Sequence, residues 1–302
     1  MNRRRALLSL AVGLVIVWTV AARGWAQNVP PKLSDEEIQK MTKALPAKAT
    51  AKPAKPHKIL LFWRCEGFFH GDGIAAGNKA IELMGEKTGA YTTVISDDMS
   101  MFNPDKLKAF DAVIFNNTTT LAFENPAQRE ALLKFVNSGQ GIVGIHSSVD
   151  NFYGWAEGAA MMGALFDSHP WQEAPVKLDD PKHPLLKAFQ GKGFWVQDEM
   201  YKMKDPYSRE KLRVLLSFDM SKLPADAPTR PDKDNPIAWI QQVGQGRVFY
   251  CSLGHNRHIF WDPQILQFYL DGIQYALGDL PADATPSAKV KPTPEPVLAP
   301  EH

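Results

Sequence analysis

Short, uninterrupted apolar runs alternate with helix-type patterns across residues 58–145, and this alternation constrains the fold more than any other feature. A continuous apolar run of strand length favours a strand buried on both faces, as in a parallel sheet. Strands and helices that follow each other in this order imply βαβ units and a doubly wound, mainly parallel α/β sheet flanked by helices. The predicted elements are strands at 58–63, 91–95, 111–115 and 142–145, and helices at 74–89 and from 125 onward.

The second half of the chain indicates additional antiparallel strands rather than further βαβ units. The segment Val243-Gly244-Gln245-Gly246 predicts a tight hairpin turn between the last two of them. Asp262 is the expected N-cap of a final helix that ends near residue 277. The predicted strands of this half are 176–178, 194–196, 213–218, 237–241 and 247–251.

The first 26 residues are typical of an export signal. Arg3, Arg4 and Arg5 precede 17 uncharged residues, and Gly24-Trp25-Ala26 offers small residues for a signal peptidase. We therefore interpret residues 1–26 as a signal peptide and expect an exported protein, periplasmic or secreted, with no membrane span in its mature form. The alternative is an uncleaved N-terminal membrane anchor, although 17 apolar residues are short for a bilayer.

Composition sets the limits of the folded domain. Residues 27–56 are rich in Pro, Ala and Lys and indicate a linker with one short helix, which Ser34 caps and which ends near Lys43. Residues 281–302 are a Pro-rich tail with few large apolar side chains, so we expect it to be disordered. The remaining residues, 57–280, suit one α/β domain. The sequence has 34 Lys+Arg against 33 Asp+Glu, so it lacks the excess of basic residues that is typical of nucleic-acid-binding proteins.

Histidines gather where the predicted strands end. Ligands of open α/β sheets bind at the carboxyl ends of the strands, and His70, His146 and His255 all follow such strands. His169 is expected in the turn after the helix that follows His146. Histidines in these places serve as general bases, metal ligands or sugar-binding groups. His146 is the leading candidate, because residues 144–148 have the strand–turn–helix context of a nucleophile elbow.

Carboxylates and aromatic rings complete the candidate site. Asp198 and Glu199 are adjacent, so on a strand at most one of them enters the site. Tyr201 and Trp261 are among the rings near these loops that can stack on sugar faces. Glu66 and Asp72 can also supply oxygen ligands. A divalent-metal site is therefore an open alternative to histidine acid–base chemistry, and its candidate ligands are His70, His146, His169 and His255.

Two cysteines, Cys65 and Cys251, follow or end predicted strands. The sequence leaves open whether they are two thiols or one disulfide in an exported protein.

Several short motifs, taken in order along residues 57–280, resemble the ThuA-like (trehalose-utilisation) domain family. The resemblance implies a class I glutamine amidotransferase-like, or flavodoxin-like, fold. The motifs are Gly67-Phe68-Phe69-His70, Gly141-Ile142-Val143-Gly144-Ile145-His146-Ser147, Gly163-Ala164-Leu165-Phe166 leading to His169-Pro170, His183-Pro184, Asp198-Glu199-Met200-Tyr201, Pro236-Ile237-Ala238-Trp239, and Gly246-Arg247-Val248-Phe249-Tyr250 ending in Leu253-Gly254-His255.

The resemblance also implies a role in disaccharide or glycoside catabolism, with a functional link to sugar oxidoreductases that make 3-keto-glycosides. Members of the family are commonly labelled glycosyl hydrolases. True amidotransferases carry Cys in a Gly-x-Cys-x-Gly elbow, whereas this chain has His146 in that place and Ser148 in place of the second Gly. Without a thiolate there is no thioester route, so glutaminase activity is not expected.

These observations predict a histidine-based hydrolase or lyase that acts on a glycoside or its keto derivative. A non-catalytic sugar-binding or interaction module is the alternative. The expected catalytic residues are His146, His255 and Glu199, and the expected substrate-binding residues are His70, His169, Asp198, Tyr201 and Trp261.

Overall fold

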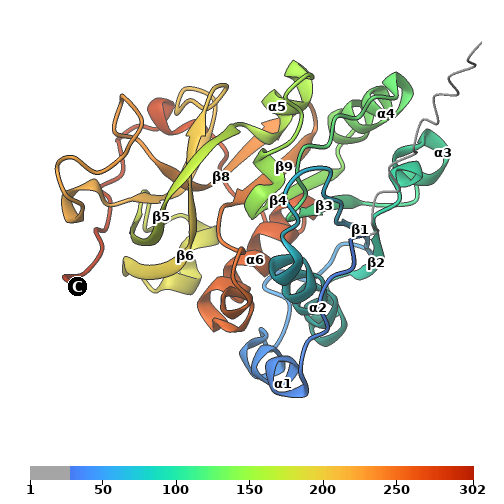
Figure 1. Ribbon diagram of the computed structural model, residues 1–302, viewed down its shortest axis with the longest axis horizontal. Helices are drawn as coiled ribbons and strands as arrows, with labels where there is room; N and C mark the ends of the chain where they lie inside the picture. Colours follow the sequence, from blue (N-terminus) through green and yellow to red (C-terminus); the bar gives the residue numbers. More distant parts are fainter. Residues whose placement is uncertain (1–27) are drawn as a thin grey trace, which may run out of the picture.

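Helices cover both faces of a nine-stranded sheet in the computed structural model, which describes residues 28–302 (Figure 1). The expected signal peptide, residues 1–26, lies outside the described residues. Within residues 28–302, none of the helices combines the length and the apolar character needed to cross a bilayer.

The first half of the sheet is parallel, as the uninterrupted apolar runs predict. In β1, Ile59 and Leu61 enter one hydrophobic cluster while Leu60 and Phe62 enter the other, and none of the four has exposed surface. A strand buried on both faces requires apolar residues at every position. The parallel strands are β1 (Lys58–Phe62), β2 (Thr92–Ser96), β3 (Ala112–Asn116), β4 (Gly141–Ile145) and β9 (Gly246–Cys251).

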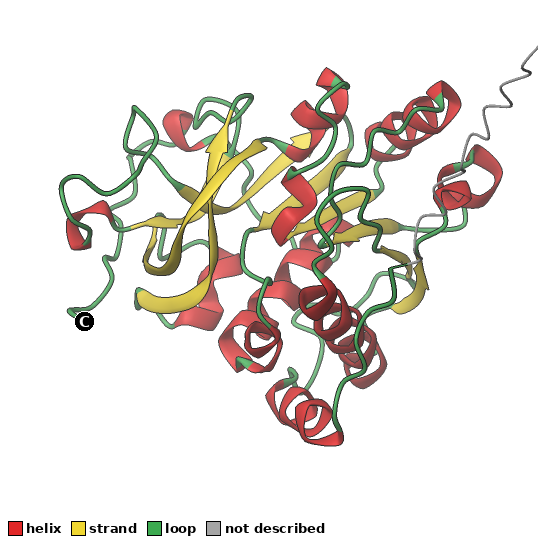
Figure 2. Ribbon diagram, viewed as in Figure 1, coloured by secondary structure: helices red, strands yellow, loops and turns green. Residues whose placement is uncertain are grey.

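The helices divide between the two faces of the sheet (Figures 1 and 2). On one face lie α2 (Gly71–Thr88) and α6 (Pro263–Leu277), with α1 (Asp35–Ala44) beyond them. On the other lie α3 (Pro104–Leu107), α4 (Pro126–Asn137) and α5 (Ala156–Met162). This two-sided cover confirms the doubly wound α/β fold. Short 3-10 turns occur at Met99–Phe102, His146–Val149, Pro184–Phe189, Met220–Lys222, Arg257–Trp261 and Ser287–Lys289.

The second half of the sheet is antiparallel, as expected, but two of its strands are longer than the sequence indicates. It consists of β8 (Pro236–Val243), β7 (Arg213–Phe218), β5 (Leu165–Leu178) and β6 (Phe194–Lys204). The full strand order is β2-β1-β3-β4-β9-β8-β7-β5-β6. The β5–β6 register shifts between Phe166 and Glu173, and such irregularities bend a strand and increase its twist.

These register shifts also correct the expected position of His169. The residue lies inside β5, not in a turn after α5. The neighbouring Pro170 and the irregular pairing interrupt the period-two pattern by which a strand is identified, so the sequence reveals only the regular end of β5, at residues 176–178.

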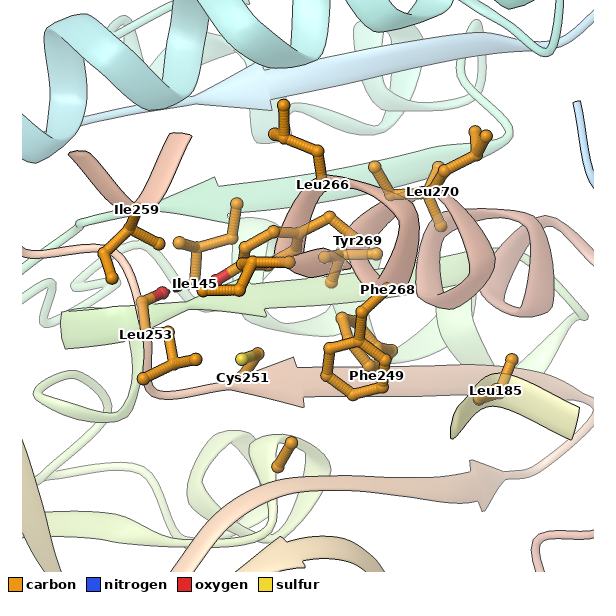
Figure 3. Packing of buried hydrophobic residues seen from close by; sticks show 14 of the residues in the cluster. Ile145, Leu185, Phe249, Cys251, Leu253, Ile259, Leu266, Phe268, Tyr269 and Leu270 are labelled. Atoms are coloured by element: carbon orange, nitrogen blue, oxygen red, sulfur yellow. Dashed lines mark hydrogen bonds between the residues drawn. The ribbon is translucent and has the colours of Figure 1, made fainter. Parts of the chain in front are cut away.

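Helix α6 packs tightly over the centre of the sheet. Figure 3 shows Leu266, Phe268 and Tyr269 of this helix above Ile145 of β4 and Phe249 of β9. All of these side chains are fully buried. The Tyr269 hydroxyl donates a hydrogen bond to the Leu253 carbonyl, which fixes the loop that follows β9.

Residues 28–56 pack on the domain, although their composition indicates a linker. The capping box of Ser34 and Glu37 starts α1 as predicted, and Met41 of this helix is fully buried. Beyond the helix, the Thr50 and Ala51 N–H groups donate to the side-chain oxygen of Gln274 on α6. Main-chain hydrogen bonds therefore hold a segment that has few apolar side chains.

The Pro-rich tail, 281–302, also differs from the expected disorder. Val297 pairs with Leu178 of β5 through two main-chain hydrogen bonds of 2.9 and 3.0 Å. The Trp195 indole N–H donates to the Pro300 carbonyl at 3.0 Å. An extended chain can be held by such bonds without the large apolar side chains on which the expectation of disorder was based.

Deletion of residues 293–302 should lower the free energy of unfolding by about 2–4 kcal/mol, because it removes several hydrogen bonds of roughly 1 kcal/mol each. Urea denaturation of the two proteins measures the difference. Deletion of residues 301 and 302 alone should cost less than about 1 kcal/mol, since the ion pairs that it removes are solvent-exposed. Equal stability of both truncated proteins would contradict the packed tail.

Candidate functional site

Four side chains from distant parts of the sequence meet at the carboxyl edge of the parallel strands. His70 precedes α2, His146 follows β4, His255 follows β9, and Glu199 lies on β6. The Glu199 Oε2 atom is 3.4 Å from His146 Nε2, 3.3 Å from His255 Nδ1 and 3.9 Å from His70 Nε2. One nitrogen or oxygen from each of the four side chains lies within 4.8 Å of all the others. We call these four residues the His–Glu cluster.

His146 occupies a strained elbow between β4 and the 3-10 turn. Its φ is +50°, a left-handed conformation that few residues other than glycine adopt. A Cβ at Gly144 would lie 2.5 Å from Ser148 Oγ, so the strand can approach the turn this closely only with glycine there. The geometry is that of a nucleophile elbow, and the residue at its tip is a histidine.

A hydrogen bond to the backbone carbonyl of Ser252 fixes the ring of His146. The side chain is fully buried, and Nδ1 lies 2.7 Å from the Ser252 carbonyl oxygen. A carbonyl can only accept, so Nδ1 carries a proton, and Nε2 faces Glu199 Oε2 and His255 Nδ1.

Asp198 positions the loop that carries His255. Its buried carboxylate accepts hydrogen bonds from the N–H groups of Gly254 at 2.6 Å, His255 at 3.2 Å and Asn256 at 2.9 Å. Adjacent strand residues point to opposite sides, so Glu199 enters the cluster while Asp198 does not. The expected contact of Asp198 with substrate is therefore corrected to a positioning role, because none of its surface is exposed.

The other expected substrate-binding residues have different positions. His169 is half exposed, and its Nδ1 lies 3.3 Å from Glu199 Oε1, the oxygen that the cluster histidines do not share. The Tyr201 hydroxyl is 3.4 Å from His70 Nε2, and its ring is 4.4 Å from the His146 ring. Trp261 instead packs near α1, with the Lys40 ammonium 5.6 Å from its ring. Its expected contact with a sugar has no support in this geometry.

Two further carboxylates offered by the sequence do not join the cluster. Glu66 pairs with Arg64 at 2.9 Å, and Asp72 pairs with Arg257 at 2.7 Å. Both cysteines are free thiols, and Cys251 is fully buried. Burial raises the pKa of the Cys251 thiol to about 12, so it is not a thiolate nucleophile.

Burial and mutual contacts shift the pKa values of Glu199, His70 and His255. Burial favours a higher pKa for Glu199, but the hydrogen bonds from the three cluster histidines outweigh it and hold the pKa well below its usual range. Burial lowers the pKa of His70 to about 4, and the neighbouring imidazoles add to this effect. For His255, burial acts in the same direction, but the Glu199 carboxylate raises the pKa above its ordinary value. Glu199 is thus stabilised as a carboxylate.

The sequence analysis missed Asp150, which lies near the elbow. Burial raises the pKa of its carboxyl group even though the Tyr153 hydroxyl donates a hydrogen bond to it. Tyr153 is half exposed, and the Lys204 ammonium lies 5.0 Å from its ring. The signal that could have identified Asp150 is its place directly after the turn of the elbow.

The fold defines the class of this protein, and comparison with known families gives its family. The sheet order and its two helical layers define an α/β protein of the doubly wound class. The family model ThuA, described as trehalose utilisation, matches residues 58–276, well over half of the sequence. The chain therefore belongs to the ThuA family, and the family description relates it to the use of carbohydrate.

Solved structures agree with this assignment. A ThuA-like protein from Bacteroides uniformis is 22% identical, with a TM-score of 0.61, and the match covers 75% of this chain and 94% of that one. A ThuA-like protein from Parabacteroides merdae is 17% identical, with a TM-score of 0.59 and coverage of 81% and 97%. At these identities the similarity establishes the fold. No curated protein matches the chain.

Substitution of Asp198 by Asn should lower the free energy of unfolding by about 2–4 kcal/mol, because hydrogen bonds to a buried charge contribute more than neutral ones and an amide N–H₂ would face a backbone donor. Chemical denaturation measures the change. The matched variant Asp72→Asn removes an exposed carboxylate and should cost less than about 1 kcal/mol. A similar small loss in both variants would show that Asp198 does not hold the loop.

Proposed function

We propose that this protein acts on a carbohydrate, as a hydrolase or lyase of a glycoside or its 3-keto derivative, with the His–Glu cluster as its reaction centre. The family description supports the carbohydrate substrate. The observation that carries the reaction centre is the convergence of three imidazoles and one carboxylate within 4.8 Å. Glu199 and His255 are partly exposed at this point, which leaves the cluster reachable from solvent.

A 3-keto-glycoside suits such a centre. The C–H bond beside its carbonyl is acidic, and loss of that proton lets the electron pair form a C=C bond while the bond to the glycosidic oxygen breaks. The departing oxygen takes up a proton. This elimination does not require the paired carboxylates of ordinary glycosidases. His146, His255 and Glu199 could assist as bases or as ligands of a cation that polarises the carbonyl.

We propose that a cleft beyond the carboxyl ends of β1 and β2, which no residue of the His–Glu cluster lines, holds the rest of a sugar substrate. Its volume is about 850 Å³, and residues 63–66 of the loop that ends at His70 form one wall. Trp63 supplies an aromatic surface, and Asn125 and Gln128 supply amide groups for hydroxyl recognition. We place the second sugar or the leaving group of the glycoside there.

The proposal includes cellular context. We propose that the protein is exported, periplasmic or secreted, through its N-terminal signal, with membrane anchoring by that segment as the alternative. A 3-keto substrate must come from oxidation of a sugar hydroxyl, so a sugar oxidoreductase is the expected functional partner. Glutaminase activity is not proposed, because the elbow carries His146 in place of a cysteine nucleophile.

Substitution of His146 by Ala should reduce turnover of a 3-keto-glycoside at least 100-fold, in line with about 10²–10⁴ for loss of a positioned catalytic group. NMR of trehalose and 3-ketotrehalose, each incubated with the purified chain, would detect the products and distinguish elimination from hydrolysis. The control His258→Gln changes an exposed histidine outside the cluster and should keep the activity.

Circular dichroism should confirm that both variants fold. Full activity of a folded His146→Ala protein would remove the cluster from the mechanism. Saturable binding of these sugars by the wild type without any product would instead indicate a sugar-binding module and contradict the catalytic proposal.

A further inference from the structure

We infer that the His–Glu cluster binds one divalent first-row transition-metal ion, held by His70, His146, His255 and Glu199. The inference deepens the proposed function, because it chooses the ligand role over the base role for the same side chains. It stands on the geometry of those side chains, however, and its test measures binding rather than turnover.

The spacing of the facing atoms fits a small cation. Ligand atoms at 2.0–2.1 Å from a tetrahedral zinc ion stand about 3.4 Å from one another. Here His146 Nε2 lies 3.3 Å from His255 Nδ1 and 3.4 Å from Glu199 Oε2, and His255 Nδ1 lies 3.3 Å from the same oxygen. The fourth ligand, His70 Nε2, is slightly farther, at 3.9 Å from Glu199 Oε2. Its nitrogen lies within 4.8 Å of the other ligand atoms, so this ring would have to move toward the ion to complete a tetrahedral shell.

The burial of His146 and His70 favours a role as metal ligands over a role as general bases. A general base must reach the proton that it takes from the substrate. The His146 side chain has no exposed surface, and that of His70 is 4% exposed. A carbohydrate C–H group cannot approach either ring without displacement of the residues above it. A metal ion needs only the space between the rings and a route past Glu199 and His255, which are partly exposed.

Surrounding contacts orient two of the four ligands, His146 and His255. Metal-binding imidazoles usually donate their other N–H to a carbonyl or carboxylate, which sets the tautomer. The Nδ1–H group of His146 donates to the Ser252 carbonyl, so Nε2 is free to coordinate. Asp198 holds the backbone of His255 and its two neighbours. These four hydrogen bonds thus end on two buried acceptors, the Ser252 carbonyl and the Asp198 carboxylate.

The donor set selects the class of ion. Imidazole nitrogens suit Zn²⁺, Fe²⁺ and neighbouring transition metals, whereas Ca²⁺ and Mg²⁺ prefer oxygen ligands. A metal ion binds imidazoles in their neutral form, so three imidazole ligands and one carboxylate would carry a single negative charge beside a divalent ion. His169 contacts only the other oxygen of Glu199 and does not belong to the converging set, which excludes one of the candidates from the sequence.

Zinc and cobalt binding to the full chain tests the inference. Protein that has been stripped with a chelator and dialysed should bind one equivalent of Zn²⁺, measured by calorimetry and by metal analysis. Co²⁺ in its place should give visible bands of a low-coordinate nitrogen–oxygen site. His255→Gln and Glu199→Gln should weaken Zn²⁺ binding more than about 100-fold, beyond the 10–100-fold typical of a lost outer-shell contact.

The matched control is His169→Gln. It removes an outer-shell contact to the other oxygen of Glu199, so Zn²⁺ affinity should fall by no more than the 10–100-fold typical of such a contact. Circular dichroism identifies variants that fail to fold, and the Co²⁺ spectrum of the wild type does not depend on any variant. Absence of stoichiometric binding by the folded wild type would overturn the inference, as would equal affinity in wild type, His255→Gln and Glu199→Gln.

The two proposals can fail separately. Metal binding without turnover of any sugar would contradict the proposed function and leave the metal site in place. Turnover of a keto-glycoside by a wild type that binds no metal would overturn the metal site and leave the cluster as a set of acid–base groups.

Discussion

One buried carboxylate holds together the parts of the fold that make the site. Asp198 lies on β6, four places from β9 in the sheet, yet it accepts hydrogen bonds from three successive N–H groups in the loop after β9. This contact requires the antiparallel half of the sheet to curl back over the carboxyl edge of the parallel half. The irregular pairing of β5 with β6 supplies the bend. Without it, Glu199 would not reach the histidines.

The elbow shows how an inherited geometry can serve different chemistry. The positive φ of His146 and the close approach at Gly144 reproduce the turn that exposes a nucleophile in other α/β enzymes. Here that position carries a buried imidazole, whose Nδ1–H donates to the Ser252 carbonyl. The elbow thus presents an imidazole nitrogen, not a thiol or hydroxyl. The same backbone turn can therefore carry different chemistry when the residue at its tip, here His146, is different.

The sequence predicts most of the parallel half, because a strand buried on both faces must be apolar at every position. It also predicts that Asp198 and Glu199 point apart, since side chains alternate along a strand. It does not predict the length of β5, because Pro170 and the register shifts remove the alternation, nor the packing of the tail, which depends on main-chain hydrogen bonds that composition does not report. The position of Trp261 depends on its packing near α1, a contact between distant segments that no local pattern encodes.

The His–Glu cluster is difficult to explain as a device for stability alone. Replacement of a buried set of charged and polar groups by apolar side chains of similar volume is often neutral or stabilising. The elbow adds backbone strain at His146. Natural sequences depart from local preference chiefly where function requires it. Strain at the elbow, a desolvated carboxylate and facing ring nitrogens all occur at one point, so a shared ligand explains them together where three separate structural reasons would otherwise be needed.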